Sequence, residues 1–142
     1  QVGSVTVPAL LHEEAHPGLV HLVSRVRGEL IPETTWPTLL NAMFPPGSVT
    51  GAPKRAAVEC IQAVEPVPRG PYCGAVGWVD ADTRTASLAV AIRTFWIEQD
   101  RVLFGTGAGI TWSSDAEAEW RETELKAGRL IDLASRTWSP LR

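Results

Sequence analysis

Glu119, Glu122 and Lys126 are charged residues that stand three and then four positions apart near the C-terminus. At this spacing their side chains share one face of a helix. Leu130 and Leu133 extend that face, and a charged face that continues into apolar residues favours an inward orientation. Two carboxylates that face an interior need a cation, and oxygen ligands at helical spacing suit Mg²⁺. In the alternative interpretation they are ordinary surface charges on an exposed helix.

A second set of candidates lies on the predicted strands and at their ends. Arg93 stands in an apolar strand row, where a guanidinium needs a carboxylate partner, supplied either by a ligand or by a buried ion pair. Residues 105–109 read GTGAG, but Ile110 occupies the position of the third glycine in a dinucleotide-binding turn. This run either exposes bare backbone N–H groups to a ligand or forms a turn that needs positive φ. His21 and Tyr72 are candidates whose alternatives are a satisfied core histidine and a packed strand residue.

These candidates depend on elements that the sequence pattern predicts. Ser114 to Glu117 reads S-D-A-E, which is typical of a serine that caps a helix and a glutamate that reaches back to it, so a helix is expected to begin near Asp115. Strands are predicted over residues 21–27, 72–79, 85–97 and 101–107, and helices over residues 34–43, 54–64 and 115–135. The last three strands are expected to form a meander. Without a βαβ rhythm, this order indicates an α+β fold, an antiparallel sheet with packed helices.

The composition describes one globular domain over residues 1–142. A net charge of −3 and the lack of a basic run offer no surface for nucleic acid, and no apolar run is long enough for a membrane span. Cys60 and Cys73 make neither a disulfide framework nor a zinc pattern, so a reducing compartment, the cytoplasm, is expected. Because the chain begins with Gln1, we expect it to be a piece of a longer protein.

Six stretches of the chain form a recognisable series. In order, they read HLVSRVRGEL, FPPGSVTGAPKRAAVECI, RGPYCGAVGW, VAIRT, GTGAGI and EAEWRETELK. The series resembles the C-terminal part of chorismate-utilising enzymes. This family includes the large components of anthranilate synthase and aminodeoxychorismate (p-aminobenzoate) synthase, and the isochorismate and salicylate synthases. The resemblance runs through nearly the whole chain and implies the C-terminal half of that family's fold.

The resemblance implies a site that binds chorismate, a dianion, with the help of Mg²⁺. Arg93 and Tyr72 would hold the enolpyruvyl carboxylate, and Gly107 with the neighbouring backbone would line the same pocket. The wall near the ring carboxylate would be formed by three residues of one turn: Ser48, Thr50 and Gly51.

The resemblance also assigns roles to the charged helix face. Glu122 would be a direct ligand of Mg²⁺, Glu119 would act through metal-bound water, and Lys126 would balance their charge. His21 matches the family's active-site histidine, with a role in orientation or proton handling.

Among the family's branches, the SVTGAPK and VAIRT stretches look most like aminodeoxychorismate synthase component I, in which ammonia replaces the C4 hydroxyl of chorismate. Ammonia would come from a glutamine amidotransferase subunit or domain. The alternative is anthranilate synthase component I, which also eliminates pyruvate and more often has a serine where Thr50 stands. A third possibility is a non-catalytic module that binds a carboxylate or a partner subunit.

Full-length members of the family are much longer than this chain. Their N-terminal part carries the other metal-binding glutamates and the general acid. We therefore expect the isolated chain not to turn over chorismate. We also expect an apolar surface that the missing N-terminal half would cover, for which four tryptophans are candidates: Trp36, Trp78, Trp96 and Trp112.

Overall fold

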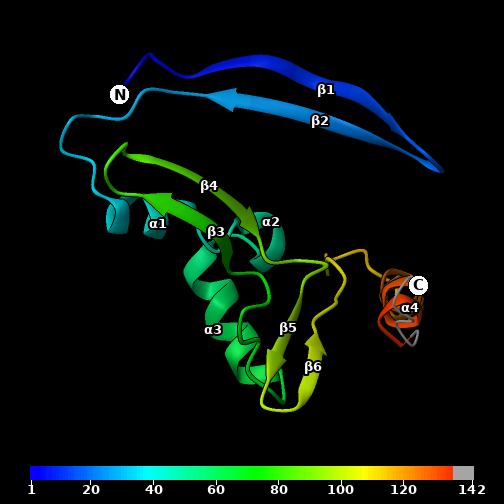
Figure 1. Cartoon of the computed structure of the whole chain (residues 1–142). Coiled ribbons are helices and arrows are strands. Elements are labelled where there is room, and N and C mark those ends of the chain that lie inside the picture. The colour runs from blue at the N-terminus through cyan, green and yellow to red at the C-terminus, as the bar shows by residue number, and fades with distance from the viewer. Residues whose placement is uncertain (136–142) are drawn as a thin grey trace, which may run out of the picture. The chain divides into compact units, whose positions relative to one another are not determined.

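The computed structural model describes residues 1–135, which form three two-stranded antiparallel sheets and four helices (Figure 1). The elements are β1 (Thr6–His16), β2 (Leu19–Arg27), α1 (Trp36–Met43), α2 (Gly47–Thr50), α3 (Lys54–Val64), β3 (Ala75–Asp80), β4 (Thr85–Val90), β5 (Phe95–Glu98), β6 (Arg101–Phe104) and α4 (Ala116–Ser135). This mixture of helices and antiparallel strands confirms the predicted α+β fold class.

The chain divides into two compact units, Gln1–Ala42 and Met43–Arg142. The expectation of one domain over residues 1–142 stays a prediction.

The first unit is built on the β1–β2 hairpin, in which Thr6 pairs with Arg27 and His16 with Leu19. Strand β2 confirms the predicted strand at residues 21–27, whereas β1, which includes Pro8, lies where no strand was predicted. The register is irregular between Thr6 and Ala9. A proline is tolerated at such a bulge because no ladder hydrogen bond is needed from it.

In the second unit, β3 and β4 form a regular hairpin with Ala75 opposite Val90 and Asp80 opposite Thr85. The carboxylate of Asp80 closes the turn, because its Oδ1 accepts hydrogen bonds from the backbone N–H groups of Asp82 and Thr83 at 2.9 and 3.2 Å. The hairpin continues past its strands through one more backbone pairing. Cys73 N–H donates to the carbonyl of Ala91 at 3.0 Å, and both residues are buried.

The predicted strand over residues 85–97 is wrong in its middle. Strand β4 ends at Val90 and β5 begins at Phe95, so two hairpins replace the expected meander. Arg93 lies in the break with φ of +52°, in the left-handed region. A residue in this conformation turns the chain away from the extended path, so the ladder cannot continue through it.

The helices lie close to their predicted positions. Helix α3 has the predicted bounds, and α4 begins one residue after Asp115. The capping residue differs, because Asp115 Oδ1 accepts a hydrogen bond from the N–H of Ala118 at 2.9 Å. Ser114 instead donates to the carboxylate of Glu119 at 2.6 Å, and Glu117 pairs with Arg121 at 3.2 Å. The predicted capping box is therefore wrong.

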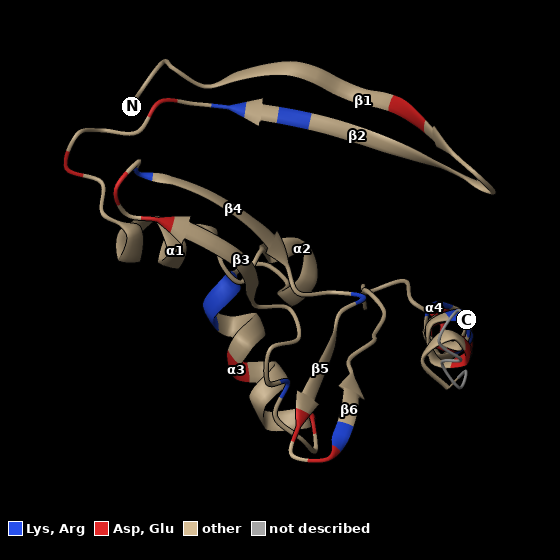
Figure 2. Cartoon of the chain, viewed as in Figure 1, with Lys and Arg blue, Asp and Glu red and all other residues tan. Residues whose placement is uncertain are grey.

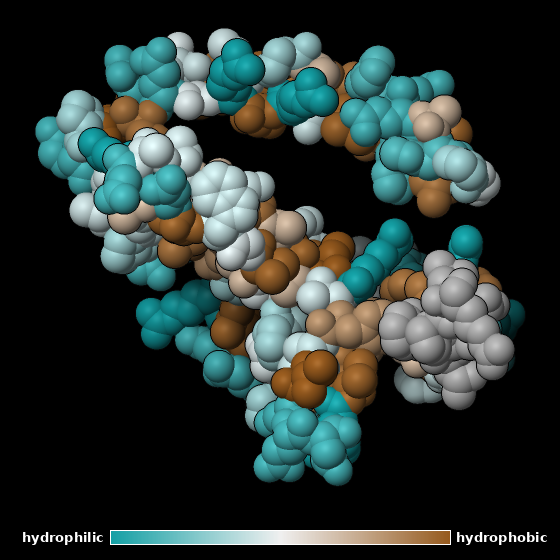
Figure 3. All heavy atoms as spheres, viewed as in Figure 1, coloured by the Kyte–Doolittle hydropathy of each residue, from teal (hydrophilic) through white to brown (hydrophobic). Residues whose placement is uncertain are grey.

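The hydrophobic core of the described residues is small. Only Cys73, Ala91 and Ala127 are buried in this part of the chain. Many large apolar side chains are exposed, and Figure 3 shows them as brown patches on the surface. Trp78 and Trp112 are exposed as expected, whereas Trp36 and Trp96 are half-buried.

Charged residues are scattered along the chain, and long stretches of ribbon contain none (Figure 2). Within residues 1–135, the structure contains no helix that combines the length and the apolar character required to cross a membrane.

Candidate functional site

A large open cavity of about 2020 Å³ lies within the second unit. Its wall comes from the α2 turn, α3 and the loop after it, the segment between β4 and β5, the glycine run after β6, and one face of α4. Eight of the ten predicted site residues line it: Ser48, Thr50, Gly51, Tyr72, Arg93, Gly107, Glu119 and Lys126. The other two predicted residues, His21 and Glu122, do not line it.

The glycine run after β6 lies directly against Tyr72. A Cβ atom at Gly105 would come within 2.5 Å of Tyr72 Cγ, and one at Gly107 would lie 3.2 Å from its hydroxyl oxygen. Neither these two glycines nor Gly109 has positive φ. The close approach of Tyr72 therefore explains Gly105 and Gly107, and the alternative of a turn that needs positive φ is wrong.

Arg93 lines the cavity from the break between β4 and β5. Its side chain is exposed, and it forms no ion pair within 4.0 Å among the described residues. Both the expected burial in a strand row and the alternative of a buried ion pair are therefore wrong. The pairing of Cys73 with Ala91 brings Tyr72 and Arg93 to the same end of the hairpin.

The α2 turn forms another part of the wall. Gly51 ends it with φ of +124°, and a Cβ there would lie 2.9 Å from the Cβ of Ala57 on α3. The hydroxyl of Thr50 donates to the carbonyl of Pro46 at 3.0 Å, so its proton is engaged within the turn and its oxygen can accept. Ser48 is exposed at the cavity.

The charged face of α4 bounds the cavity on another side. Glu119 is half-buried and accepts the Ser114 hydrogen bond at 2.6 Å. Lys126 donates to the carbonyl of Gly107 at 3.3 Å and pairs with Glu122 at 2.5 Å. Glu122 is 52% exposed, compared with 36% for Lys126.

The inward face of α4 is rotated from the predicted one. Its more buried positions are Glu119, Thr123, Lys126, Ala127 and Leu130. The other members of the predicted face, Glu122 and Leu133, are exposed.

The residues on α4 fit a divalent cation in donor type but supply only part of a ligand set. Glu119 and Glu122 carry the carboxylate oxygens that Mg²⁺ prefers. Among the described residues, no group of three or more His, Cys, Asp or Glu side chains is arranged to hold a metal. A complete site therefore needs ligands beyond these two carboxylates.

His21 lies on β2 in the first unit, with its side chain exposed. The alternative of a core histidine is therefore wrong. The ring centroid of His21 is 5.0 Å from that of His16, and His21 lies opposite Glu14 in the hairpin register.

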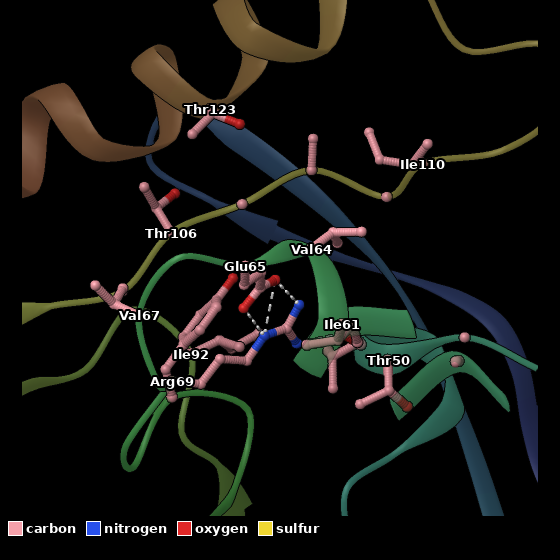
Figure 4. A pocket seen from close by; sticks show the side chains of 18 of the residues that line it. Thr50, Ile61, Val64, Glu65, Val67, Arg69, Ile92, Thr106, Ile110 and Thr123 are labelled. Carbon is pink, nitrogen blue, oxygen red and sulfur yellow. Dashed lines mark hydrogen bonds and ion pairs between the residues drawn. The ribbon is translucent and has the colours of Figure 1, made fainter. Parts of the chain in front are cut away.

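Sequence reasoning missed Arg69, which lines the cavity beside Tyr72. Figure 4 shows its guanidinium facing the carboxylate of Glu65. Nη2 of Arg69 donates to Oε1 of Glu65 at 2.6 Å. This hydrogen bond lowers the pKa of Glu65 and raises that of Arg69. Burial raises the pKa of the Tyr72 phenol, Cys73 adds to this effect, and the charge of Arg69 opposes it. The i,i+4 spacing of Glu65 and Arg69 is the signal that could have identified the pair.

Comparisons with known proteins agree with this mixed fold. Residues 1–132 match the family model described as chorismate binding enzyme. The chain is 42% identical over 124 residues to anthranilate synthase component 1 of Saccharolobus solfataricus, and the match covers 87% of this chain and 29% of that protein. It is 42% identical over 135 residues to anthranilate synthase component 1 of Synechocystis, covering 92% of this chain and 26% of that protein.

Two crystal structures are similar to this fold. Anthranilate synthase component I from Streptococcus pneumoniae TIGR4 superposes with a TM-score of 0.77 and 38% identity, covering 89% of this chain and 29% of that one. The protein DhbC from Bacillus anthracis, described as a 2,3-dihydroxybenzoate-specific isochorismate synthase, gives a TM-score of 0.79 and 29% identity, covering 95% of this chain and 36% of that one.

The family match and the two structural matches define an α+β protein of the chorismate-utilising class. The chain belongs to the family of chorismate binding enzymes. It spans about 29% of the length of the Saccharolobus relative that it matches.

Proposed function

We propose that this chain forms the chorismate-binding part of an anthranilate synthase component I. The relatives from Saccharolobus solfataricus and Synechocystis are both named anthranilate synthase component 1. These names support the alternative raised from the sequence over its main expectation, aminodeoxychorismate synthase. One observation carries the binding part of the proposal: Arg93 lines the same cavity as Tyr72 and has no ion-pair partner among the described residues. The other cations that line the cavity, Arg69 and Lys126, are both paired with glutamates.

The carboxylate of the enolpyruvyl group would bind between Arg93 and Tyr72. A guanidinium fork matches the two oxygens of a carboxylate. A tyrosine phenol is protonated at neutral pH, and burial raises the pKa of Tyr72 further, so its hydroxyl can donate a hydrogen bond to the same group. The bare backbone at Gly107 allows the ligand to approach the tyrosine hydroxyl closely.

The ring carboxylate would lie between the α2 turn and α4. Ser48 offers a hydroxyl donor to the carboxylate there, whereas Thr50 would only line the wall, because its hydroxyl already donates to the carbonyl of Pro46. Glu119 and Glu122 would hold Mg²⁺ together with ligands from outside this chain. When bound, Mg²⁺ would offset the negative charge of the ring carboxylate and act as a Lewis acid. Lys126 would compensate the acidic pair, as its contact with Glu122 supports.

In the complete enzyme, ammonia would add to the ring as the hydroxyl leaves, and pyruvate would then be eliminated. His21 would handle a proton or orient the ring. The ammonia would be supplied by a glutamine amidotransferase subunit or domain. The remaining part of the relatives' length would supply the general acid and the other metal ligands, so the isolated chain is expected to bind chorismate without turning it over.

Calorimetric titration of chorismate into the chain, with and without Mg²⁺, tests the binding part of this proposal. Binding should be weak, require Mg²⁺, and be lost in Arg93→Ala. Arg55→Ala is the matched control, because Arg55 is an exposed arginine of α3 that does not line the cavity. No heat in any condition, or equal losses in both variants, would count against the proposed site.

The reaction is tested by a chimera in which this chain replaces the matching 124-residue stretch of the Saccharolobus enzyme. With chorismate, Mg²⁺ and ammonium, the fluorescence of anthranilate and the release of pyruvate should appear together. An aminated product that keeps its enolpyruvyl group would favour aminodeoxychorismate synthase, the reading that Thr50 supported in the sequence.

A further inference from the structure

Arg69 contacts four residues, of which three line the cavity: Val49, Glu65 and Tyr72. Its Nε lies 2.9 Å from Oε2 of Glu65. Its Nη1 donates to the carbonyl of Val49 at 3.3 Å and to the sulfur of Cys73 at 3.5 Å. Its guanidinium carbon lies 5.6 Å from the centroid of the Tyr72 ring, within the range of a cation–π contact. Figure 4 shows the ion pair with Glu65 at the cavity.

These contacts join three segments that the chain order separates. Val49 belongs to the α2 turn, Glu65 follows the end of α3, and Tyr72 and Cys73 precede β3. Tyr72 is also packed against Gly105, so its ring contacts both Arg69 and the glycine run. A guanidinium can serve all of these groups at once because its five N–H donors point in fixed directions.

The environment of Arg69 separates it from an ordinary surface arginine. Its side chain is 25% exposed, compared with 93% for Arg55, which forms an i,i+4 pair with Glu59 on α3. Both pairs have the same spacing and the same chemistry. Only Arg69 lines the cavity, so Arg55 provides a matched control on the same part of the chain.

We propose that Arg69 is a positioning residue, which holds the Tyr72 ring and the α2 turn in the arrangement that the carboxylate pocket needs. The identity of the ligand rests on the proposed function. The positioning role itself rests on the contacts of Arg69 and is tested without a ligand.

The first test follows the Tyr72 phenol, because this is the single tyrosine of the chain and its absorbance reports one group. Arg69→Lys keeps the positive charge but replaces the fork with one ammonium, which cannot reach all the partners. Burial is the largest cause of the raised phenol pKa, and Cys73 and Glu65 also raise it while Arg69 lowers it. Release of the ring into water should therefore lower the Tyr72 pKa toward its ordinary value. Arg55→Lys should leave this pKa unchanged.

The second test uses glycine signals in nuclear magnetic resonance spectra of the ¹⁵N-glycine-labelled chain at neutral pH. The signals of Gly105 and Gly107 sense the Tyr72 ring, whereas no atom lies within 4 Å of a Cβ built at Gly18 or Gly128. In Arg69→Lys the first two signals should move and the last two should stay. Unfolding would instead move all four signals. In that case the milder Glu65→Gln variant, which keeps Arg69 but weakens its ion pair, would be compared in the same way.

The third test measures chorismate affinity with Mg²⁺, which should fall about tenfold or more in Arg69→Lys and not in Arg55→Lys. Full retention of affinity, of the phenol pKa and of the glycine signals in Arg69→Lys would overturn the positioning role. If the unmodified chain binds no chorismate, the proposed function fails, and the phenol and glycine measurements still decide the role of Arg69.

Discussion

At the scale of single residues, the contact between Tyr72 and Gly105 leaves no space for a larger side chain. A methyl group at Gly105 would lie within 2.8 Å of three ring and side-chain atoms of Tyr72. An aromatic ring attached next to the buried Cys73 cannot retreat without moving the backbone.

Gly105→Ala should therefore displace the Tyr72 ring and weaken chorismate binding about tenfold, with a loss of stability of about 1–3 kcal/mol from overpacking. Gly109→Ala is the control, because a Cβ at Gly109 meets no atom within 4 Å and its φ is not positive. Calorimetry and thermal denaturation of both variants measure the two effects. Equal behaviour of the two alanine variants would contradict the packing argument.

The sequence predicted the types of residue at the cavity better than their surroundings. The glycine run was identified as bare backbone, but its cause, the ring of Tyr72, comes from a residue far away in the chain. Arg93 was identified through a strand row that does not exist, and it reaches the cavity from a left-handed turn. Arg69 was missed because its partner Glu65 lies across a proline-rich loop, where helical spacing rules are not normally applied.

At the scale of elements, the start of α4 controls the placement of the acidic residues. Asp115 caps the helix, and Ser114 holds the carboxylate of Glu119 from the segment just before it. The loop before the helix thus fixes both the helix terminus and one of its predicted metal ligands.

Removal of the cap should destabilise α4. Asp115→Ala should lower the free energy of unfolding by about 1 kcal/mol, because the N–H of Ala118 loses its acceptor. Asp115→Asn should keep most of the stability, since an asparagine oxygen can accept the same hydrogen bond. Urea denaturation followed by far-ultraviolet circular dichroism measures the difference. An asparagine variant as unstable as the alanine variant would show that the charge of Asp115, rather than its hydrogen bond, stabilises the helix.

Element boundaries followed from the sequence where local chemistry determines them. The bounds of α3 agree because prolines precede and follow it. The strand over residues 85–97 was predicted as continuous because nothing in the sequence near Arg93 requires positive φ. Strand β1 was missed because a proline within a run argues against a strand, and the bulge that accommodates Pro8 depends on pairing with β2.

At the scale of the whole molecule, exposed apolar side chains greatly outnumber buried ones among the described residues. They include residues of β1 and β2, Trp112 in the segment before α4, and Trp120 on α4. An isolated two-stranded hairpin is only marginally stable in water, so β1 and β2 need a further surface to pack against. The remaining length of the relatives is the partner that we propose.

The isolated chain should therefore bind a hydrophobic dye such as 8-anilinonaphthalene-1-sulfonate strongly. Addition of the polypeptide formed by the unmatched part of the Saccharolobus relative should reduce the dye fluorescence and raise the midpoint of thermal unfolding. An unrelated folded protein at the same concentration serves as the control. If the dye signal is no higher than that of the control protein, these apolar surfaces are already covered.

Over evolutionary time, the contact between Tyr72 and Gly105 restricts the order in which substitutions can accumulate. A lineage that first replaces Gly105 with a larger residue would displace the tyrosine ring. A lineage that first replaces Tyr72 with a smaller residue could tolerate both substitutions. The two positions therefore behave as one inherited unit, and homologous chains should keep the tyrosine and the glycine together or lose them together.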